Sequence, residues 1–129
     1  MIFVMATEKD FYRWLSSNIF KKIPDFRWDR LESRVSSNGL PDITYSYNGH
    51  HGFIELKYAD VLEKNEKFKL KHPVTPSQLF WLSERNRIGG HCYVCIGTID
   101  NIYITKGPDI SFSCPRKGPD KVPWMASIL

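Results

Sequence analysis

The clearest structural signal in the chain lies in residues 42–58, which have the sequence DITYSYNGHHGFIELKY. Apolar and polar residues alternate on both sides of Asn48-Gly49, a dipeptide typical of two-residue hairpin turns. The alternation predicts two antiparallel strands with one apolar and one polar face. The expected apolar face consists of Ile43, Tyr45, Tyr47, Ile54, Leu56 and Tyr58.

The polar face of this hairpin gathers charged residues. A two-residue turn places Asp42 opposite Glu55, whereas a register longer by two residues pairs Asp42 with Lys57. In either register, two carboxylates and one ammonium group converge on one face of the sheet. The carboxylates repel each other and raise each other's pKa unless a cation lies between them.

Such an oxygen-rich site suits Mg²⁺ or Mn²⁺, which bind few carboxylates and keep waters for a phosphate substrate. A lysine beside the metal can orient or deprotonate an attacking water. The hairpin therefore predicts a site for phosphodiester hydrolysis. The alternative is a solvated polar face with a Lys–Glu pair across the strands.

Two helices are expected around the hairpin. The first covers residues 7–22, where Thr7 caps the start and an apolar stripe recurs at helical spacing. Glu8 shares the inward face of this helix, although an acid in the first turn also favours the helix dipole. The second begins at Thr75, with Pro76 at its first position and Gln78 placed to complete a capping box.

The remaining segments predict an α/β domain with a mixed sheet of about five strands. Residues 26–35, 92–96 and 102–104 are expected to be extended. Residues 59–74 are expected to form a polar, lysine-rich connection. A proline-rich tail over 106–129 is expected to be irregular, which leaves a core at about 7–105 of a single domain spanning 1–129.

Composition limits the class of protein. The chain has 129 residues, a net charge of +4, 42% hydrophobic and 25% charged residues, which excludes disorder and a coiled coil. Apolar runs of about six residues are too short to span a membrane, and the start of the chain does not resemble a signal peptide. Three cysteines without a disulfide framework fit a reducing, cytoplasmic setting. Cys92 and Cys95 would point to opposite faces of a strand, so core packing is expected for both.

The spacing of the acidic residues resembles a known nuclease family. Gly39-Leu40-Pro41-Asp42 followed by Glu55-Leu56-Lys57 resembles the PD-(D/E)XK motif. The whole pattern is similar to small viral-type VRR-NUC domains and archaeal-type Holliday junction resolvases. These share a glutamate on the first helix, matched by Glu8, and a helix start matched by Thr75-Pro76-Ser77-Gln78 with Trp81-Leu82. The resemblance spans residues 7–105.

This resemblance implies a restriction-endonuclease-like core and a role for each matched residue. Asp42, Glu55 and the main-chain carbonyl of Leu56 would bind Mg²⁺, for which Mn²⁺ would substitute. Lys57 would handle the attacking water, and Glu8 would complete the acidic pocket or hold a second metal or water. Gln78 would support Lys57 or the scissile phosphate, although it is equally explained by the capping box alone.

The implied function is a metal-dependent DNA endonuclease acting on branched DNA, as in recombination and repair in a bacterial or phage-infected cell. A homodimer is also implied, and exposed Trp124, Met125, Ile128 and Leu129 would serve its interface. Basic residues expected to contact DNA phosphates are Lys64, Lys67, Lys69, Lys71 and Arg34. Two alternatives remain: a nuclease for end processing, restriction or RNA cleavage, and a nucleic-acid-binding module that does not cut.

Overall fold

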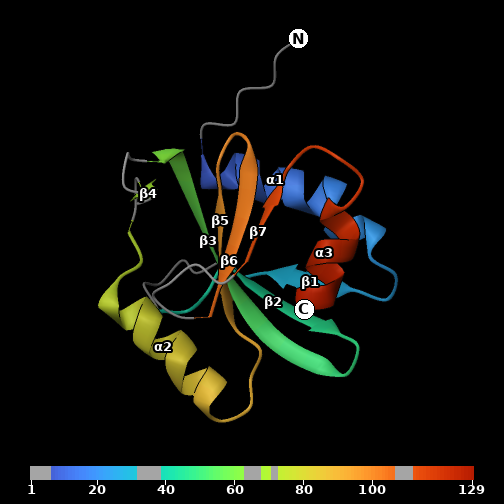
Figure 1. Cartoon of the computed structure of the whole chain (residues 1–129). Helices are drawn as coiled ribbons and strands as arrows, with labels where there is room; N and C mark the ends of the chain where they lie inside the picture. Colours follow the sequence, from blue (N-terminus) through green and yellow to red (C-terminus); the bar gives the residue numbers. More distant parts are fainter. Residues whose placement is uncertain (1–6, 32–38, 63–67, 71–72, 107–111) are drawn as a thin grey trace.

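A mixed β-sheet organises the molecule (Figure 1). The computed structural model describes residues 7–31, 39–62, 68–70, 73–106 and 112–129. Within these ranges, six strands lie in the order β1-β2-β3-β5-β6-β7, and β4 pairs separately with β3. Their bounds are β1 Arg27–Arg30, β2 Ile43–Tyr47, β3 His50–Leu62, β4 Phe68–Leu70, β5 Tyr93–Gly97, β6 Asn101–Thr105 and β7 Phe112–Pro115. The parallel pairing of β3 with β5 among antiparallel pairs confirms the predicted α/β mixed sheet.

The β2–β3 hairpin has the two-residue turn that the sequence predicts. Ile43 pairs with Ile54, and Tyr47 pairs with His50. Asn48 and Gly49 both adopt positive φ angles, of 50° and 78°. Positive φ angles at both central residues are typical of a type I′ turn, whose twist matches that of the flanking strands. The register therefore places Asp42, just before β2, beside the segment of β3 that carries Glu55.

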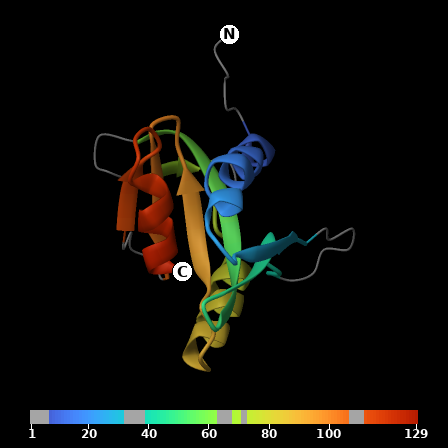
Figure 2. The ribbon, with the colours of Figure 1, turned by 90° about the vertical axis from the view of Figure 1, so that its right-hand side faces the viewer.

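The two faces of the sheet carry separate apolar clusters. Helix α1 (Glu8–Asn18) and helix α3 (Lys121–Ile128) contribute to the larger cluster, which contains the apolar hairpin residues. Helix α2 (Pro76–Arg87) packs Leu82 into the smaller cluster with Val94 and Ile96. Figures 1 and 2 show α1 and α2 near opposite ends of the strands. Glu55 and Lys57 alternate with the apolar residues of β3, so they lie on the α2 side.

The first helix starts as predicted but ends earlier. The Thr7 hydroxyl accepts the Asp10 backbone N–H at 3.1 Å, which confirms the cap. The α-helix stops at Asn18, and a 3₁₀ turn, η1 (Phe20–Lys22), follows. The Asn18 side-chain amide donates to the Trp14 carbonyl at 2.9 Å. In a continuing α-helix, that carbonyl would accept a backbone N–H from one turn further along. The Asn18 side chain therefore competes with helix propagation.

The lysine-rich connection is shorter than predicted. Strand β3 continues to Leu62, and β4 returns antiparallel, with Ala59 opposite Leu70 and Leu62 opposite Phe68. The connection predicted over 59–74 is therefore interrupted by the end of β3 and by β4. Among the predicted phosphate contacts, Arg34, Lys64, Lys67 and Lys71 lie outside the described residues, and Lys69 is described only by its backbone. The predicted extended segment at 26–35 forms β1 only over Arg27–Arg30, and 32–38 also lie outside that description.

The C-terminal segment corrects the prediction of an irregular tail. It forms edge strand β7 and helix α3, whose Met125 is 1% exposed. Prolines did not prevent this, because Pro115 ends an edge strand and Pro123 lies in the first turn of α3. Both positions tolerate a missing N–H donor. Leu129 is 4% exposed, so Met125 and Leu129 belong to the core instead of the exposed dimer surface that we predicted. Trp124 and Ile128 are partly buried against the same cluster.

The cysteines are placed as predicted. Cys92 belongs to the cluster on the α2 face and Cys95 to the cluster on the other face, so the two thiols point apart. Both are buried, as is Cys114, and all three are free thiols. In the part of the chain that the structure describes, no helix is long and apolar enough to cross a membrane.

Candidate active site

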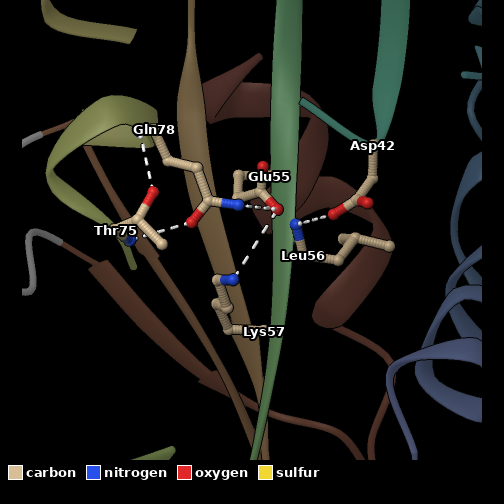
Figure 3. Close-up of polar contacts among 6 residues, drawn as sticks. All are labelled: Asp42, Glu55, Leu56, Lys57, Thr75 and Gln78. Atoms are coloured by element: carbon tan, nitrogen blue, oxygen red, sulfur yellow. Dashed lines mark hydrogen bonds and ion pairs between the residues drawn. The ribbon is translucent and has the colours of Figure 1, made fainter. Parts of the chain in front are cut away.

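The N-terminal end of β2 fixes the first carboxylate. An Asp42 carboxylate oxygen accepts the backbone N–H of Leu56 at 2.8 Å (Figure 3). The bond is formed just beyond Ile43, where the β2–β3 ladder ends. It fixes the Asp42 side chain against β3, next to Glu55. The hairpin therefore adopts the shorter of the two registers that the sequence allows.

Strand β3 brings Glu55 and Lys57 together in a buried environment. The Lys57 ammonium lies 3.8 Å from the Oε1 oxygen of Glu55, and the two residues are only 4% and 3% exposed. Gln78 of α2 donates its side-chain N–H to the same oxygen at 3.4 Å. Figure 3 shows both donors directed at Glu55 from one side, with Asp42 on the other.

The second oxygen of Glu55 is unusual. Within the described ranges, Oε2 is buried and has no hydrogen-bond partner. A buried carboxylate oxygen without a partner costs free energy, because water no longer solvates it. This oxygen is therefore positioned to accept a proton or a cation.

The pKa of Glu55 is raised to about 9, mainly by burial. The neighbouring Asp42 carboxyl and the charge of Glu8 also raise it, and Lys57 lowers it. Without a cation, the Glu55 carboxyl therefore retains a proton at neutral pH. A divalent cation would replace that proton and relieve the repulsion between the two carboxylates.

The donor set fits a hard divalent cation that retains water ligands. Among the described residues, no group of three or more His, Cys, Asp or Glu side chains is arranged to hold a metal. Mg²⁺ commonly binds through one or two carboxylates and keeps several waters. Asp42 and the unpartnered oxygen of Glu55 provide such a pair.

Gln78 combines the two roles that the sequence left open. Its side-chain oxygen accepts the Thr75 backbone N–H at 2.9 Å, and its own backbone N–H donates to the Thr75 hydroxyl at 3.1 Å. This confirms the predicted capping box. The side-chain nitrogen of Gln78 contacts Glu55, whereas the resemblance implied support of Lys57 or of the scissile phosphate. One amide thus connects the start of α2 to the acidic site.

Glu8 adds a third acidic side chain from α1. It is the first residue of that helix and is half-buried. Its charge raises the pKa of Glu55, so the two carboxylates interact electrostatically. The inward placement expected from helical spacing is therefore consistent with a position near the site.

One structural contact at the site was not predicted. Gly39 has a φ of 83°, and a Cβ there would lie 2.5 Å from the Ser77 backbone carbonyl. The loop that delivers Asp42 therefore packs directly on the first turn of α2, which delivers Gln78. A glycine is needed both for the φ angle and for the close approach. Gly39 was part of the sequence motif, but the motif gave no indication of this contact.

No family model matches the sequence, and no curated protein matches it. The structure is similar to that of Hjc, a Holliday junction resolvase from the archaeal hyperthermophile Archaeoglobus fulgidus. The TM-score is 0.48 and the sequence identity is 19%, over 92% of this chain and 94% of that chain.

Proposed function

We propose that the protein is a metal-dependent DNA endonuclease that hydrolyses phosphodiester bonds. The observation that supports this is the buried Glu55 carboxyl, which lies between Asp42 and Lys57 and has one oxygen unpartnered. A purely structural Lys–Glu pair would not require a second, partly buried carboxylate beside it. The electrostatic cost of this arrangement is explained if a cation and a phosphate complete it.

Each residue has a defined task in this proposal. Asp42, Glu55 and the Leu56 main-chain carbonyl would hold Mg²⁺ or Mn²⁺, which would polarise the scissile phosphate and lower the pKa of water. Lys57 would orient the attacking water and, in its neutral amine form, would accept a proton from it. Gln78 holds the Glu55 carboxylate in place through the bond to Oε1. Glu8 would complete the negative pocket or hold a second metal or water.

Branched DNA is the proposed substrate, with a four-way junction first. This choice rests on the resemblance of the sequence pattern to junction resolvases. The net charge of +4 is compatible with binding a polyanion. Resolving a junction requires two cuts, so the proposal includes a homodimer. Met125 and Leu129 are buried within the chain, so the interface must be formed by other residues.

The test is cleavage of a labelled four-way junction, its matched linear duplex, a single strand and an RNA duplex. Wild type and Glu55→Gln would each be assayed with Mg²⁺, Mn²⁺ and EDTA. Glu84→Gln is the matched control, because Glu84 lies on α2 and pairs with Arg87 at the surface. We expect metal-dependent junction cleavage by wild type and the control, and none by Glu55→Gln.

Other outcomes would separate the alternatives. Metal-dependent cleavage of linear DNA or RNA in preference to the junction would support the proposed phosphodiester hydrolysis. It would show that the substrate is not branched DNA. Binding without cleavage of any substrate would overturn the proposal in favour of a binding module.

A further inference from the structure

A row of polar side chains crosses the sheet on the same face as the acidic site. Arg27 of β1 pairs with Ser46 of β2, and Ser46 pairs with His51 of β3. Directly paired residues on antiparallel strands point to the same face, so these three side chains form a row. His51 and Glu55 are four residues apart on β3, which places them on the same face as well.

We propose that this row, Arg27–Ser46–His51, binds a backbone phosphate of the substrate strand away from the scissile bond. The inference rests on the proposed nuclease function and adds a second contact point for its DNA. His51 and Glu55, four residues apart on β3, are separated by about 13 Å. A DNA strand carries one phosphate per about 3.4 Å of helix axis. A DNA strand that follows β3 therefore presents one phosphate at Glu55 and another, several nucleotides away, at the Arg27–Ser46–His51 row.

The chemistry of the row suits a phosphate. The Ser46 hydroxyl and the His51 Nδ1 atom are 2.7 Å apart, which fixes the imidazole ring. Arg27 is exposed, and one of its five N–H groups donates to the neighbouring Phe26 carbonyl at 3.2 Å. A guanidinium, a hydroxyl and an imidazole on one line provide a positive charge and hydrogen-bonding groups for phosphate oxygens.

A nearby charge indicates which path the strand takes. Asp29 pairs with Thr44, so it occupies the next row toward the acidic site, at the outer strand β1. Its carboxylate would repel phosphates that pass over β1 there. The substrate strand would therefore run along β2 and β3 between the two sites, and reach Arg27 only at the row itself.

The neighbouring residues on the opposite face are engaged within the protein. His50 bonds the Leu129 carbonyl through Nδ1 at 2.9 Å and stacks on His91 with ring centroids 3.9 Å apart. Arg30 lies over the Tyr12 ring, with the guanidinium carbon 4.8 Å from the centroid. Arg30 has the same charge as Arg27, is also exposed and belongs to the same strand. Arg30→Ala is therefore a matched control for the face of the sheet.

The first test is binding of a fluorescent four-way junction to the full chain in EDTA over a range of salt concentrations. Arg27→Ala should weaken binding about 3- to 10-fold and reduce the salt slope by about one, as expected for a lost phosphate contact. His51→Ala should weaken binding to a similar extent. Arg30→Ala should bind as wild type does. Wild-type affinity of Arg27→Ala and His51→Ala would overturn the inference, as would an equal loss in Arg30→Ala.

The second test locates the phosphate. Neutral methylphosphonates would replace single phosphates, one position at a time, in each strand near the cleavage point. We expect one position, several nucleotides from that point, where the replacement weakens wild type but not the double variant Arg27→Ala/His51→Ala. Equal sensitivity of both proteins at every position would contradict the inference. Binding in EDTA does not require cleavage, so the binding test applies even to a protein that never cuts. Binding without cleavage would overturn the proposed function, and the effects of Arg27→Ala and His51→Ala would still test the row.

Discussion

Glu55 carries most of the chemistry of the candidate site. Its carboxyl is buried among Asp42, Lys57 and Gln78, and its raised pKa follows mainly from the loss of solvation. The raised pKa of Glu55 makes the stability of the fold depend on pH, with or without a substrate. Between about pH 4.5 and pH 9, the folded chain binds a proton at Glu55 that the unfolded chain has released.

The first prediction concerns pH and stability. The proton-dependent stability is fully present below the unfolded pKa and is lost as the pH rises through the folded pKa. Stability therefore falls by up to about 1.4 kcal/mol per pH unit within this window. Glu55→Gln cannot lose a proton, so we expect it to become more stable than wild type, by about 1–3 kcal/mol near pH 8. Urea unfolding in EDTA at pH 5 and pH 8 measures this difference. Parallel pH profiles of the two proteins would contradict the raised pKa.

The second prediction separates the two roles of Gln78. Glutamate at this helix position preserves a capping box. Gln78→Glu would nevertheless replace the N–H donor to Glu55 with a further carboxylate. We expect a thermal midpoint in EDTA close to that of wild type and a cleavage rate at least about 10-fold lower, since one hydrogen bond to a charged group is exchanged for a repulsion. Wild-type cleavage by Gln78→Glu would show that the residue only caps the helix.

The sequence alone predicts part of this site, for a local reason. Asp42, Glu55 and Lys57 belong to a single hairpin, whose register follows from the Asn48-Gly49 turn. The contact of Gln78 with Glu55 depends on how α2 docks on the sheet. No local pattern records that docking, and the resemblance placed Gln78 near Lys57 or a phosphate, not against Glu55.

At the scale of elements, α2 delivers Gln78 and is fixed at its start by Thr75. We predict that Thr75→Ala lowers the free energy of unfolding by about 0.5–2 kcal/mol, the usual value for a lost N-cap. It should also reduce cleavage, because the first turn of α2 holds Gln78 against Glu55. Urea unfolding and a cleavage assay measure the two effects. Ser83→Ala, at an exposed position on the same helix, is the control and should change neither.

Helix α3 shows why the sequence prediction failed at the C-terminus. Its prolines predict an irregular segment only if their positions are ignored, because Pro123 lies where a helix needs no internal N–H donor. Met125 and Leu129 are apolar and lie four residues apart, and they do not form the exposed surface predicted for them. Their helical spacing instead places both against the sheet.

The fourth prediction tests this part of the core. Met125→Ala should lower the free energy of unfolding by about 2–5 kcal/mol, as expected for a buried large-to-small substitution. Ser127→Ala, at an exposed position on the same helix, should change it by less than about 1 kcal/mol. Urea denaturation of the two variants provides the comparison. A small effect of Met125→Ala would contradict the core position of α3.

At the scale of the whole molecule, the larger apolar cluster and the buried Glu55–Lys57 pair lie on opposite faces of the sheet. The larger cluster, with α1 and α3, lies on one face, while Glu55, Lys57 and α2 lie on the other. The alternating hairpin and the two capped helices were enough to predict this α/β arrangement. The number of strands was underestimated, because β4 is short and β7 lies among prolines. Short edge strands carry weak periodic signals, so the sequence gives little indication of them.

This arrangement predicts that Lys57 acts in the chemical step and contributes little to folding or DNA binding. The experiment is the single-turnover rate of junction cleavage by Lys57→Met in saturating Mg²⁺, with Lys117→Met, an exposed lysine, as the control. We expect a loss of about 10²- to 10⁴-fold in rate for Lys57→Met, as for a missing general acid–base group. Its junction affinity should be unchanged and the control should cleave at the wild-type rate. Cleavage by Lys57→Met at the wild-type rate would contradict the assignment of this site to phosphodiester hydrolysis.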